Sequence, residues 1–265
     1  MKNEFKNKVV WIIGASSGIG AELAIQLNKL GAFVILSARK HKELLAVQSS
    51  LEFPSESMVV EMDLEQSELF ESLAQKIVDK KGKIDFLFNN GGVSQRGNAR
   101  DTSIAIDRRI MEINYFGNIA LTKAVLPYMI TKKSGHIVVI SSIAGKFGFF
   151  LRSAYSASKH ALQGFYESLL LEEAEHNINV TIAYPGKINT PISMSALTAD
   201  GKANGKMDHN QATGMPVEVC VKKILVAVSK KKKSVLVGNK EILPVYIKRF
   251  SPKLFWKIIK NQSPT

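Results

Sequence analysis

The chain has 265 residues, of which 45% are hydrophobic and 22% charged, and its single cysteine is Cys220. This composition excludes disordered, collagen-like and disulfide-stabilised proteins, and one cysteine favours a reducing compartment, so we expect a cytoplasmic protein. The N-terminal residues lack the pattern of a secretory signal, and we expect no membrane-spanning helix. The net charge is +13, and residues 230–265 supply nine of these charges through ten basic residues and one acid.

Short apolar runs alternate with longer helical patterns along the chain. Strands are expected at residues 8–13, 32–37, 57–61, 84–88, 136–140, 179–184 and 234–237, and helices at 18–30, 41–51, 65–81, 102–131 and 153–176. Runs this apolar are typical of strands covered on both faces, and their alternation with helices implies right-handed crossovers between parallel strands. The sequence therefore predicts an α/β fold, a single doubly wound parallel sheet of the Rossmann type with helices on both faces.

Two regions differ from this regular pattern. Residues 187–215, within the expected domain of residues 1–240, are rich in Gly, Asn, Asp and Thr, which is typical of a substrate-binding loop. Residues 241–265 form a basic amphipathic segment, in which Pro252 argues against one straight helix. This segment could lie peripherally on an anionic membrane, cover its own active site or contact another subunit.

A glycine-rich turn follows the first expected strand. Glycines allow the backbone to approach a pyrophosphate, and the first amides of the next helix point at its negative charge. The spacing is GxxxGxG, and a plain tight turn is the alternative, but the position directly after a buried strand favours dinucleotide binding. The candidate cofactor residues here are Gly14, Ser16, Ser17, Gly18, Ile19 and Gly20.

The second expected strand ends in Ser37-Ala38-Arg39. An enzyme that prefers NAD usually places an acid here for the ribose 2′-hydroxyl, whereas an arginine accommodates the 2′-phosphate of NADP. Arg39 can make a bidentate phosphate contact, although a solvated loop arginine is the alternative. The sequence thus predicts NADP(H) as the cofactor.

Tyr155 and Lys159 are four residues apart in a helical pattern and therefore share a face. A phenol with a pKa near 10 is a poor acid–base catalyst, and a neighbouring ammonium is expected to lower that pKa. Ser142, just past the fifth strand, can hydrogen-bond a substrate oxygen on which charge develops. We predict that these three side chains interconvert a carbonyl and an alcohol; the alternative is a half-buried tyrosine beside a solvated lysine.

The motifs occur in the order found in one known family. The glycine turn, Asn89-Asn90-Gly91-Gly92, Asn114, Ser142, the Tyr155–Lys159 motif and Pro185-Gly186 together resemble the short-chain dehydrogenase/reductase family over about residues 6–240. Residues 153–162 and the lysine-rich region 217–237 resemble the branch that contains the family-7 dehydrogenase/reductases. The resemblance implies an oxidoreductase that transfers a hydride, assembled as a homodimer or homotetramer.

A second YxxxK pattern, Tyr128 to Lys132, tests how specific the motif is. Ser142 lies thirteen residues before Tyr155, which is the separation found in the family. Thirteen residues before Tyr128 lies Tyr115, which cannot take the part of the serine. Tyr128 is therefore interpreted as a decoy.

The resemblance also implies residue roles that the spacing alone does not establish. It implies that Lys159 binds the nicotinamide ribose and that Asn114 holds a water in the proton relay. Asp63 resembles an adenine-contacting aspartate and Asn90 a cofactor-side asparagine, with helix capping and turn formation as the alternatives. Contacts to the nicotinamide carboxamide are expected at Pro185, Ile188 and Thr190, of which Thr190 could instead cap a helix.

Two residues depart from the family pattern, because Ile13 stands where a threonine is usual and Gly91 where an alanine is usual. Both changes are expected to affect packing around the cofactor and not the reaction.

Apolar residues expected near the reacting centre suggest a bulky lipophilic carbonyl or alcohol as substrate, although the phenylalanines could instead pack at a subunit contact. The five histidines never have ligand spacing, so no metal is expected, and without a recognised module neither is nucleic-acid binding. A cofactor-binding regulator or scaffold with little turnover is the rival function. The residues expected around the substrate are Ser94, Gln95, Phe147, Phe149, Phe150, Ile188, Met194 and Leu197.

Overall fold

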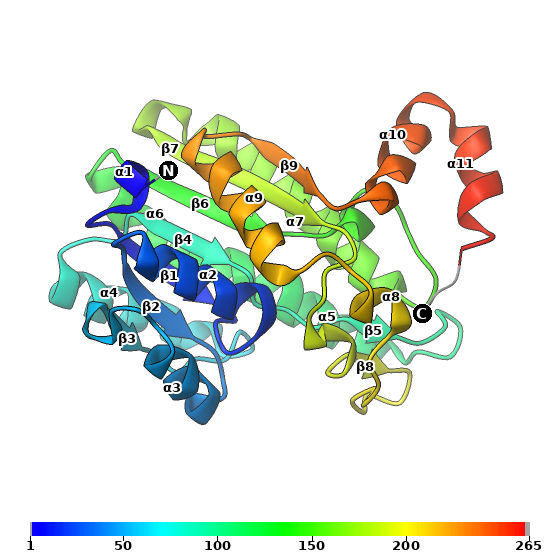
Figure 1. Cartoon of the computed structure of the whole chain (residues 1–265), viewed down its shortest axis with the longest axis horizontal. Coiled ribbons are helices and arrows are strands. Elements are labelled where there is room, and N and C mark those ends of the chain that lie inside the picture. Colours follow the sequence, from blue (N-terminus) through cyan, green and yellow to red (C-terminus); the bar gives the residue numbers. More distant parts are fainter. Residues whose placement is uncertain (1, 263–265) are drawn as a thin grey trace.

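The centre of the protein is a seven-stranded sheet in which every neighbouring pair of strands is parallel (Figure 1). The computed structural model describes residues 2–262, with the backbone alone at Lys2. The strand order is β3-β2-β1-β4-β6-β7-β9, which confirms the predicted Rossmann-type α/β fold. The strands are β1 (Val9–Ile13), β2 (Phe33–Ser37), β3 (Ser57–Val59), β4 (Phe86–Asn89), β6 (Gly135–Ile140), β7 (Ile178–Pro185) and β9 (Ser234–Val237).

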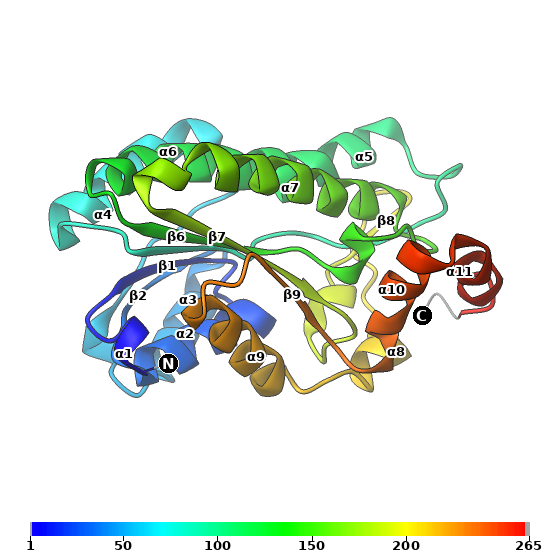
Figure 2. The same cartoon turned by 90° about the horizontal axis from the view of Figure 1, so that it is seen from above.

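Helices cover both faces of the sheet (Figure 2). Because side chains alternate along a strand, Val10 and Ile12 of β1 enter one core while Trp11 and Ile13 enter the other. Leu23 packs into the first of these cores and Tyr166 into the second. The first face carries α1 (Lys2–Phe5), α2 (Gly18–Lys29), α3 (His41–Ser49) and α9 (Val217–Ser229), and the second carries α4 (Phe70–Lys81), α5 (Ile104–Met111), α6 (Gly117–Thr131) and α7 (Ser153–Glu172).

Some local structure differs from the sequence-based expectation. The helix expected over 102–131 begins at Ile104 and contains a π-helical turn, Glu112–Phe116. The loop 187–215 contains the short helix α8 (His209–Ala212) and the strand β8 (Leu197–Thr198), which pairs with β5 (Gln95–Arg96). The β5–β8 pair joins residues about a hundred positions apart, so no local pattern predicts it.

The C-terminal segment folds as two helices, α10 (Leu243–Phe250) and α11 (Pro252–Ile259). Pro252 begins α11, where its missing N–H costs nothing, so one straight helix is indeed absent there. Figures 1 and 2 show both helices at one end of the molecule, beyond the end of β9. Between residues 2 and 262, no helix combines the length and apolarity needed to cross a membrane.

Candidate active site

A long cleft runs along the carboxyl ends of β1, β2 and β4. Between β1 and β4 the strand order reverses direction, which is where open α/β sheets bind ligands. The cleft has a volume of about 630 Å³, within the range of small-molecule sites. It brings together nine of the sequence-predicted cofactor residues: Gly14, Ser16, Ser17, Gly18, Ile19, Arg39, Asp63, Asn90 and Thr190.

The glycine turn is shaped for a diphosphate. Gly14 has a φ of +73°, which L side chains rarely adopt, and a Cβ on Gly20 would lie 2.0 Å from the carbonyl oxygen of Gly14. Helix α2 begins at Gly18, and the preceding Ser17 makes no side-chain capping hydrogen bond. The first amides of α2 are therefore available to an anion. These features fit a dinucleotide, which the turn residues would hold by its phosphates.

The far end of the cleft carries the residues that were expected to contact the adenosine. The Arg39 side chain is half exposed, and its Nη1 lies 3.9 Å from Oδ2 of Asp63. Oδ1 of Asp63 accepts a hydrogen bond from the backbone N–H of Glu65 at 3.1 Å. Ala38 lines the same end of the cleft. Arg39 is thus an exposed cation at the cleft edge, held loosely enough to turn toward a ligand.

The two departures from the family pattern are neighbours in space. A Cβ on Gly91 would lie 2.9 Å from Cγ2 of Ile13 and 2.7 Å from Cδ1 of Leu64. An alanine methyl at position 91 would therefore crowd Leu64 and the Cγ2 methyl of Ile13, a methyl that threonine also carries, so the glycine is not explained by the larger size of Ile13. Nearby, Nδ2 of Asn90 donates to the carbonyl oxygens of Ile13 (3.1 Å) and Gly14 (3.2 Å), which ties the glycine turn to β4.

A second cavity adjoins the cleft and contains the candidate catalytic residues. Ser142 follows β6, and Tyr155 and Lys159 lie on α7; all three line this cavity. Nζ of Lys159 lies 5.7 Å from the centroid of the Tyr155 ring. Oγ of Ser142 accepts a hydrogen bond from the backbone N–H of Ala144 at 3.1 Å, which orients the hydroxyl. Pro185 and Ile188, both predicted to contact the cofactor, line the same cavity.

The expected effect of Lys159 on the acidity of Tyr155 is wrong for this structure. Burial raises the pKa of Tyr155, and a hydrogen bond with Ser142 and the charges of Arg152 and Arg96 only partly oppose this. Burial also lowers the pKa of Lys159 to about 8, while its Nζ donates to the carbonyl oxygen of Ile140 at 3.0 Å. Desolvation of the phenolate thus outweighs the groups that lower the pKa, and Tyr155 is protonated at neutral pH.

Asn114 lies in the π-helical turn and joins two parts of the site. Its Oδ1 accepts from the N–H of Val93 at 2.7 Å, and its Nδ2 donates to the Val93 carbonyl at 2.9 Å and to Oγ of Ser158 at 3.0 Å. A Cβ on Gly92 would lie 2.9 Å from Oδ1 of Asn114 and 3.6 Å from Nζ of Lys159. Asn114 therefore fixes the loop after β4 against α7, immediately beside Lys159.

The residues expected around the substrate divide between three places. Ser94, Phe147, Phe149 and Ile188 line the catalytic cavity, as predicted. Gln95 does not, because its amide is buried and its Oε1 accepts the N–H of Tyr155 at 3.2 Å, at the start of α7. Of the remaining three, Met194 and Leu197 line the adjoining cofactor cleft, and Phe150 is 43% exposed and lines neither cavity.

The second YxxxK pattern lies elsewhere in the fold. The hydroxyl of Tyr128, on α6, donates to Oε1 of Gln75 on α4 at 2.7 Å. Neither Tyr128 nor Lys132 lines either cavity. Tyr128 and Lys132 therefore lie outside the candidate active site.

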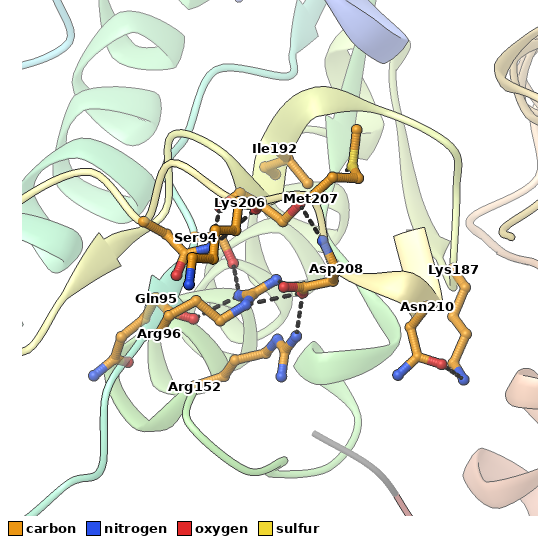
Figure 3. Close-up of polar contacts among 12 residues, drawn as sticks. Ser94, Gln95, Arg96, Arg152, Lys187, Ile192, Lys206, Met207, Asp208 and Asn210 are labelled. Carbon is orange, nitrogen blue, oxygen red and sulfur yellow. Dashed lines mark hydrogen bonds and ion pairs between the residues drawn. The ribbon is translucent and has the colours of Figure 1, made fainter. Parts of the chain in front are cut away.

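Sequence reasoning missed a buried ionic cluster at the edge of the catalytic cavity, formed by Arg96, Arg152 and Asp208 (Figure 3). Nε of Arg96 donates to Oδ2 of Asp208 at 2.9 Å, its Nη2 also contacts that oxygen, and Nη2 of Arg152 donates to it at 3.2 Å. Nη1 of Arg96 donates to Oγ of Ser94 at 2.9 Å. No sequence signal links residues 112 positions apart.

This arginine–aspartate cluster joins the loop 187–215 to the start of α7. Asp208 belongs to the loop 187–215, Arg96 to β5, and Arg152 directly precedes α7. The side chains of Arg96 and Asp208 are each 4% exposed and that of Arg152 is 12% exposed. Burial and the charge of Arg96 lower the pKa of Arg152 to about 10. Asp208 therefore stabilises two buried guanidinium groups and holds the loop over the cavity.

We expect Asp208→Asn to lower the free energy of unfolding by about 3 kcal/mol, because two guanidinium groups then lose their buried counter-charge. The loop should also loosen, so KM for a carbonyl substrate should rise more than kcat falls. Denaturant unfolding and steady-state kinetics measure these effects. Asp200→Asn is the matched control, because Asp200 lies in the same loop but its salt bridge with Lys202 is exposed. Equal behaviour of the two variants would contradict the proposed role of Asp208.

Comparison with known proteins gives a consistent result along the chain. Residues 8–201 match the family model described as short chain dehydrogenase. The chain is 42% identical to dehydrogenase/reductase SDR family member 7B of Mus musculus over 99% of this chain and 83% of that protein. It is 39% identical to the dehydrogenase/reductase SDR family protein 7-like of Drosophila melanogaster over 98% of this chain and 82% of that protein.

Solved structures show the same fold. A short-chain dehydrogenase from Streptomyces avermitilis superposes with a TM-score of 0.81 at 26% identity, covering 97% of this chain and 100% of its own. A short chain dehydrogenase/reductase from Burkholderia phymatum, solved in complex with NAD, has a TM-score of 0.83 at 22% identity, with coverage of 99% and 98%.

Proposed function

Because this chain belongs to the short-chain dehydrogenase/reductase family, and is therefore an oxidoreductase with a nicotinamide cofactor, we propose that it is an NADP(H)-dependent carbonyl reductase for a bulky lipophilic substrate. The observation that carries this proposal is the position of Ser142, Tyr155 and Lys159 in a cavity that adjoins the glycine-turn cleft. The chemistry that a nicotinamide would supply at this place is a hydride for the substrate carbon.

The acid–base chemistry belongs to Tyr155. Since burial keeps the pKa of Tyr155 above its ordinary value, the phenol carries its proton at neutral pH and can donate it to the substrate oxygen. Ser142 donates a hydrogen bond to that oxygen as negative charge develops. Lys159 is held by the carbonyl oxygen of Ile140 beside the tyrosine, where its cation stabilises the phenolate left after proton transfer. These properties favour the direction of carbonyl reduction.

The proposed preference for NADP(H) rests on the cleft edge after β2. Arg39 offers a guanidinium there, and Ala38 places no acid where a ribose 2′-hydroxyl would need an acceptor. A 2′-phosphate can therefore form charge-assisted hydrogen bonds with Arg39.

The proposed lipophilic substrate rests on the lining of the catalytic cavity. The lining includes five large apolar side chains together with the polar groups of Ser142 and Tyr155; the apolar ones are Ile143, Phe147, Phe149, Ile188 and Ile192. Burial of the hydrocarbon part of a substrate against these side chains stabilises the complex, while hydrogen bonds from Ser142 and Tyr155 position its carbonyl group.

Measuring NADPH oxidation by absorbance, with a panel of ketones of increasing hydrocarbon size, tests the function. We expect kcat/KM to rise with apolar area, by up to about fourfold for each buried methylene. A panel of equally large hydrophilic ketones is the control. Saturable NADPH binding without oxidation of any ketone would support the scaffold alternative instead.

A further inference from the structure

The C-terminal helix pair, α10 and α11, is a firmly attached part of the protein. Phe255 is 1% exposed, and its ring packs edge-to-face on Phe147 at a centroid distance of 5.4 Å. Ile259 joins the same apolar cluster. Nζ of Lys248 donates to the carbonyl oxygen of Lys146 at 3.0 Å. One side of each helix thus contacts the residues that form the wall of the catalytic cavity.

Large apolar side chains of the helix pair that do not pack against the cavity wall are exposed. Phe250 is 79% exposed and Trp256 60% exposed, although aromatic side chains this large are usually largely buried. Of the fifteen strongly exposed large apolar side chains in residues 2–262, five lie within the 14 residues 243–256. Such a concentration marks an interaction surface. Its members are Leu243, Tyr246, Phe250, Leu254 and Trp256.

The charge around this surface has one sign. The helix pair and the residue after it contain five basic residues and no acid. The acid that precedes the pair, Glu241, is turned away, because its Oε1 accepts the backbone N–H of Lys187 at 3.1 Å. An anionic partner is therefore complementary to the surface. Four of the basic residues are exposed and the fifth, Lys248, is the one whose Nζ contacts the Lys146 carbonyl on the inner side; the exposed four are Arg249, Lys253, Lys257 and Lys260.

We propose that the exposed side of the C-terminal helix pair binds peripherally to an anionic lipid bilayer. Aromatic side chains such as Tyr246 and Trp256 are favoured at the membrane interface, and a face of apolar residues flanked by lysine and arginine is typical of helices that lie in it. Two helices of eight residues each bury only a shallow apolar face, so the contact is peripheral and depends on anionic lipid.

The position of the surface connects it to the site. Phe147 lines the catalytic cavity on one side and packs on Phe255 on the other. If the proposed function holds, a lipophilic ketone dissolved in the bilayer lies next to the cavity wall when the helix pair is bound. The membrane proposal itself needs no turnover, so its test and that of the reductase activity can fail separately.

Fluorescence of the native protein gives a direct test. The chain has two tryptophans, of which Trp11 is 0% exposed and donates to Oγ of Ser37, whereas Trp256 is exposed. Added vesicles of phosphatidylcholine with about 30% phosphatidylserine should shift the emission to the blue. Brominated lipids should quench the signal of Trp256 but not that of Trp11. Phosphatidylcholine alone should have little effect, and 0.5 M salt should reverse the binding.

Two variants with matched controls locate the surface by co-sedimentation with the same vesicles. Phe250→Ser should weaken binding about tenfold, whereas Leu171→Ser on α7, where Leu171 is 75% exposed, should bind as the native protein does. Lys253→Glu with Lys257→Glu should weaken binding more than about tenfold, while the same charge change at Lys76 and Lys80 on α4 should not.

The proposal is overturned if native protein does not sediment with anionic vesicles, or if the control variants lose binding equally. It is also overturned if the vesicles remain unbound while Phe250→Ser converts an oligomer to a smaller species in light scattering. That result would assign the surface to a contact between two copies of the chain.

Discussion

Tyr155→Phe is expected to slow carbonyl reduction by about a hundredfold to ten-thousandfold, because the variant has no proton to give to the substrate oxygen. NADPH affinity should change by less than about threefold, since the ring still fills the same buried space. Steady-state kinetics gives the first quantity, and a fluorescence titration with NADPH gives the second. Full residual turnover would remove Tyr155 from the mechanism.

The chain contains its own control for this experiment. Tyr128→Phe removes the hydroxyl of the second YxxxK pattern, which contacts Gln75 on α4 and not the site, so its activity should equal that of the native protein. The pH dependence offers a further check on Tyr155. Because the pKa of Tyr155 is raised while burial lowers the pKa of Lys159 to about 8, reduction should stay constant through neutral pH and fall above about pH 8, as Lys159 loses the charge that stabilises the phenolate. Oxidation of an alcohol needs the phenolate and should instead increase with pH.

Arg39→Ala is expected to weaken NADPH binding by about tenfold to a hundredfold, through the loss of charge-assisted hydrogen bonds to the 2′-phosphate. NADH lacks this phosphate, so its affinity should change by less than about twofold. Isothermal titration with both nucleotides measures the two changes. The ratio of the two affinities is the informative quantity, because general damage to the cleft would lower both.

Lys42→Ala is the matched control for Arg39. Lys42 is an exposed cation on α3 that does not line the cleft, so its removal changes the net charge equally without touching the ligand. Equal losses of NADPH and NADH affinity in Arg39→Ala, or an Arg39-like effect in Lys42→Ala, would defeat the assignment of the 2′-phosphate site.

The prediction from sequence succeeded where a short segment carries its own physical signal. The run Val9–Ile13 is apolar on every residue because its strand is covered on both faces, and the glycine turn directly follows it. Likewise, Tyr155 and Lys159 share one helix, so their proximity needs no tertiary information. Ser142 and the glycine turn then meet at the carboxyl edge because all strands run in the same direction.

The sequence could not predict features that depend on contacts between distant segments. The sign of the pKa shift of Tyr155 follows from how completely the fold buries the phenol, and neighbouring residues in the chain do not reveal this. The crowding that Ile13 and Leu64 create around Gly91 likewise appears only in the folded chain, where β1 and β4 lie side by side. The protonation state of Tyr155 in the tyrosine–lysine motif therefore depends on how the folded chain surrounds it.

The sequence by itself determined the class of fold, the main strands and helices along the chain, the position of the glycine turn and the tyrosine–lysine pair, since each depends on periodicity or spacing within a few turns of chain. Only the tertiary structure decided which side chains line the cavity beside Tyr155, which charges meet at Asp208, and which side chains of the C-terminal helix pair remain exposed. The physical reason is that burial and electrostatic interaction depend on distances in space, and those distances are set by the packing of segments that are remote in the sequence.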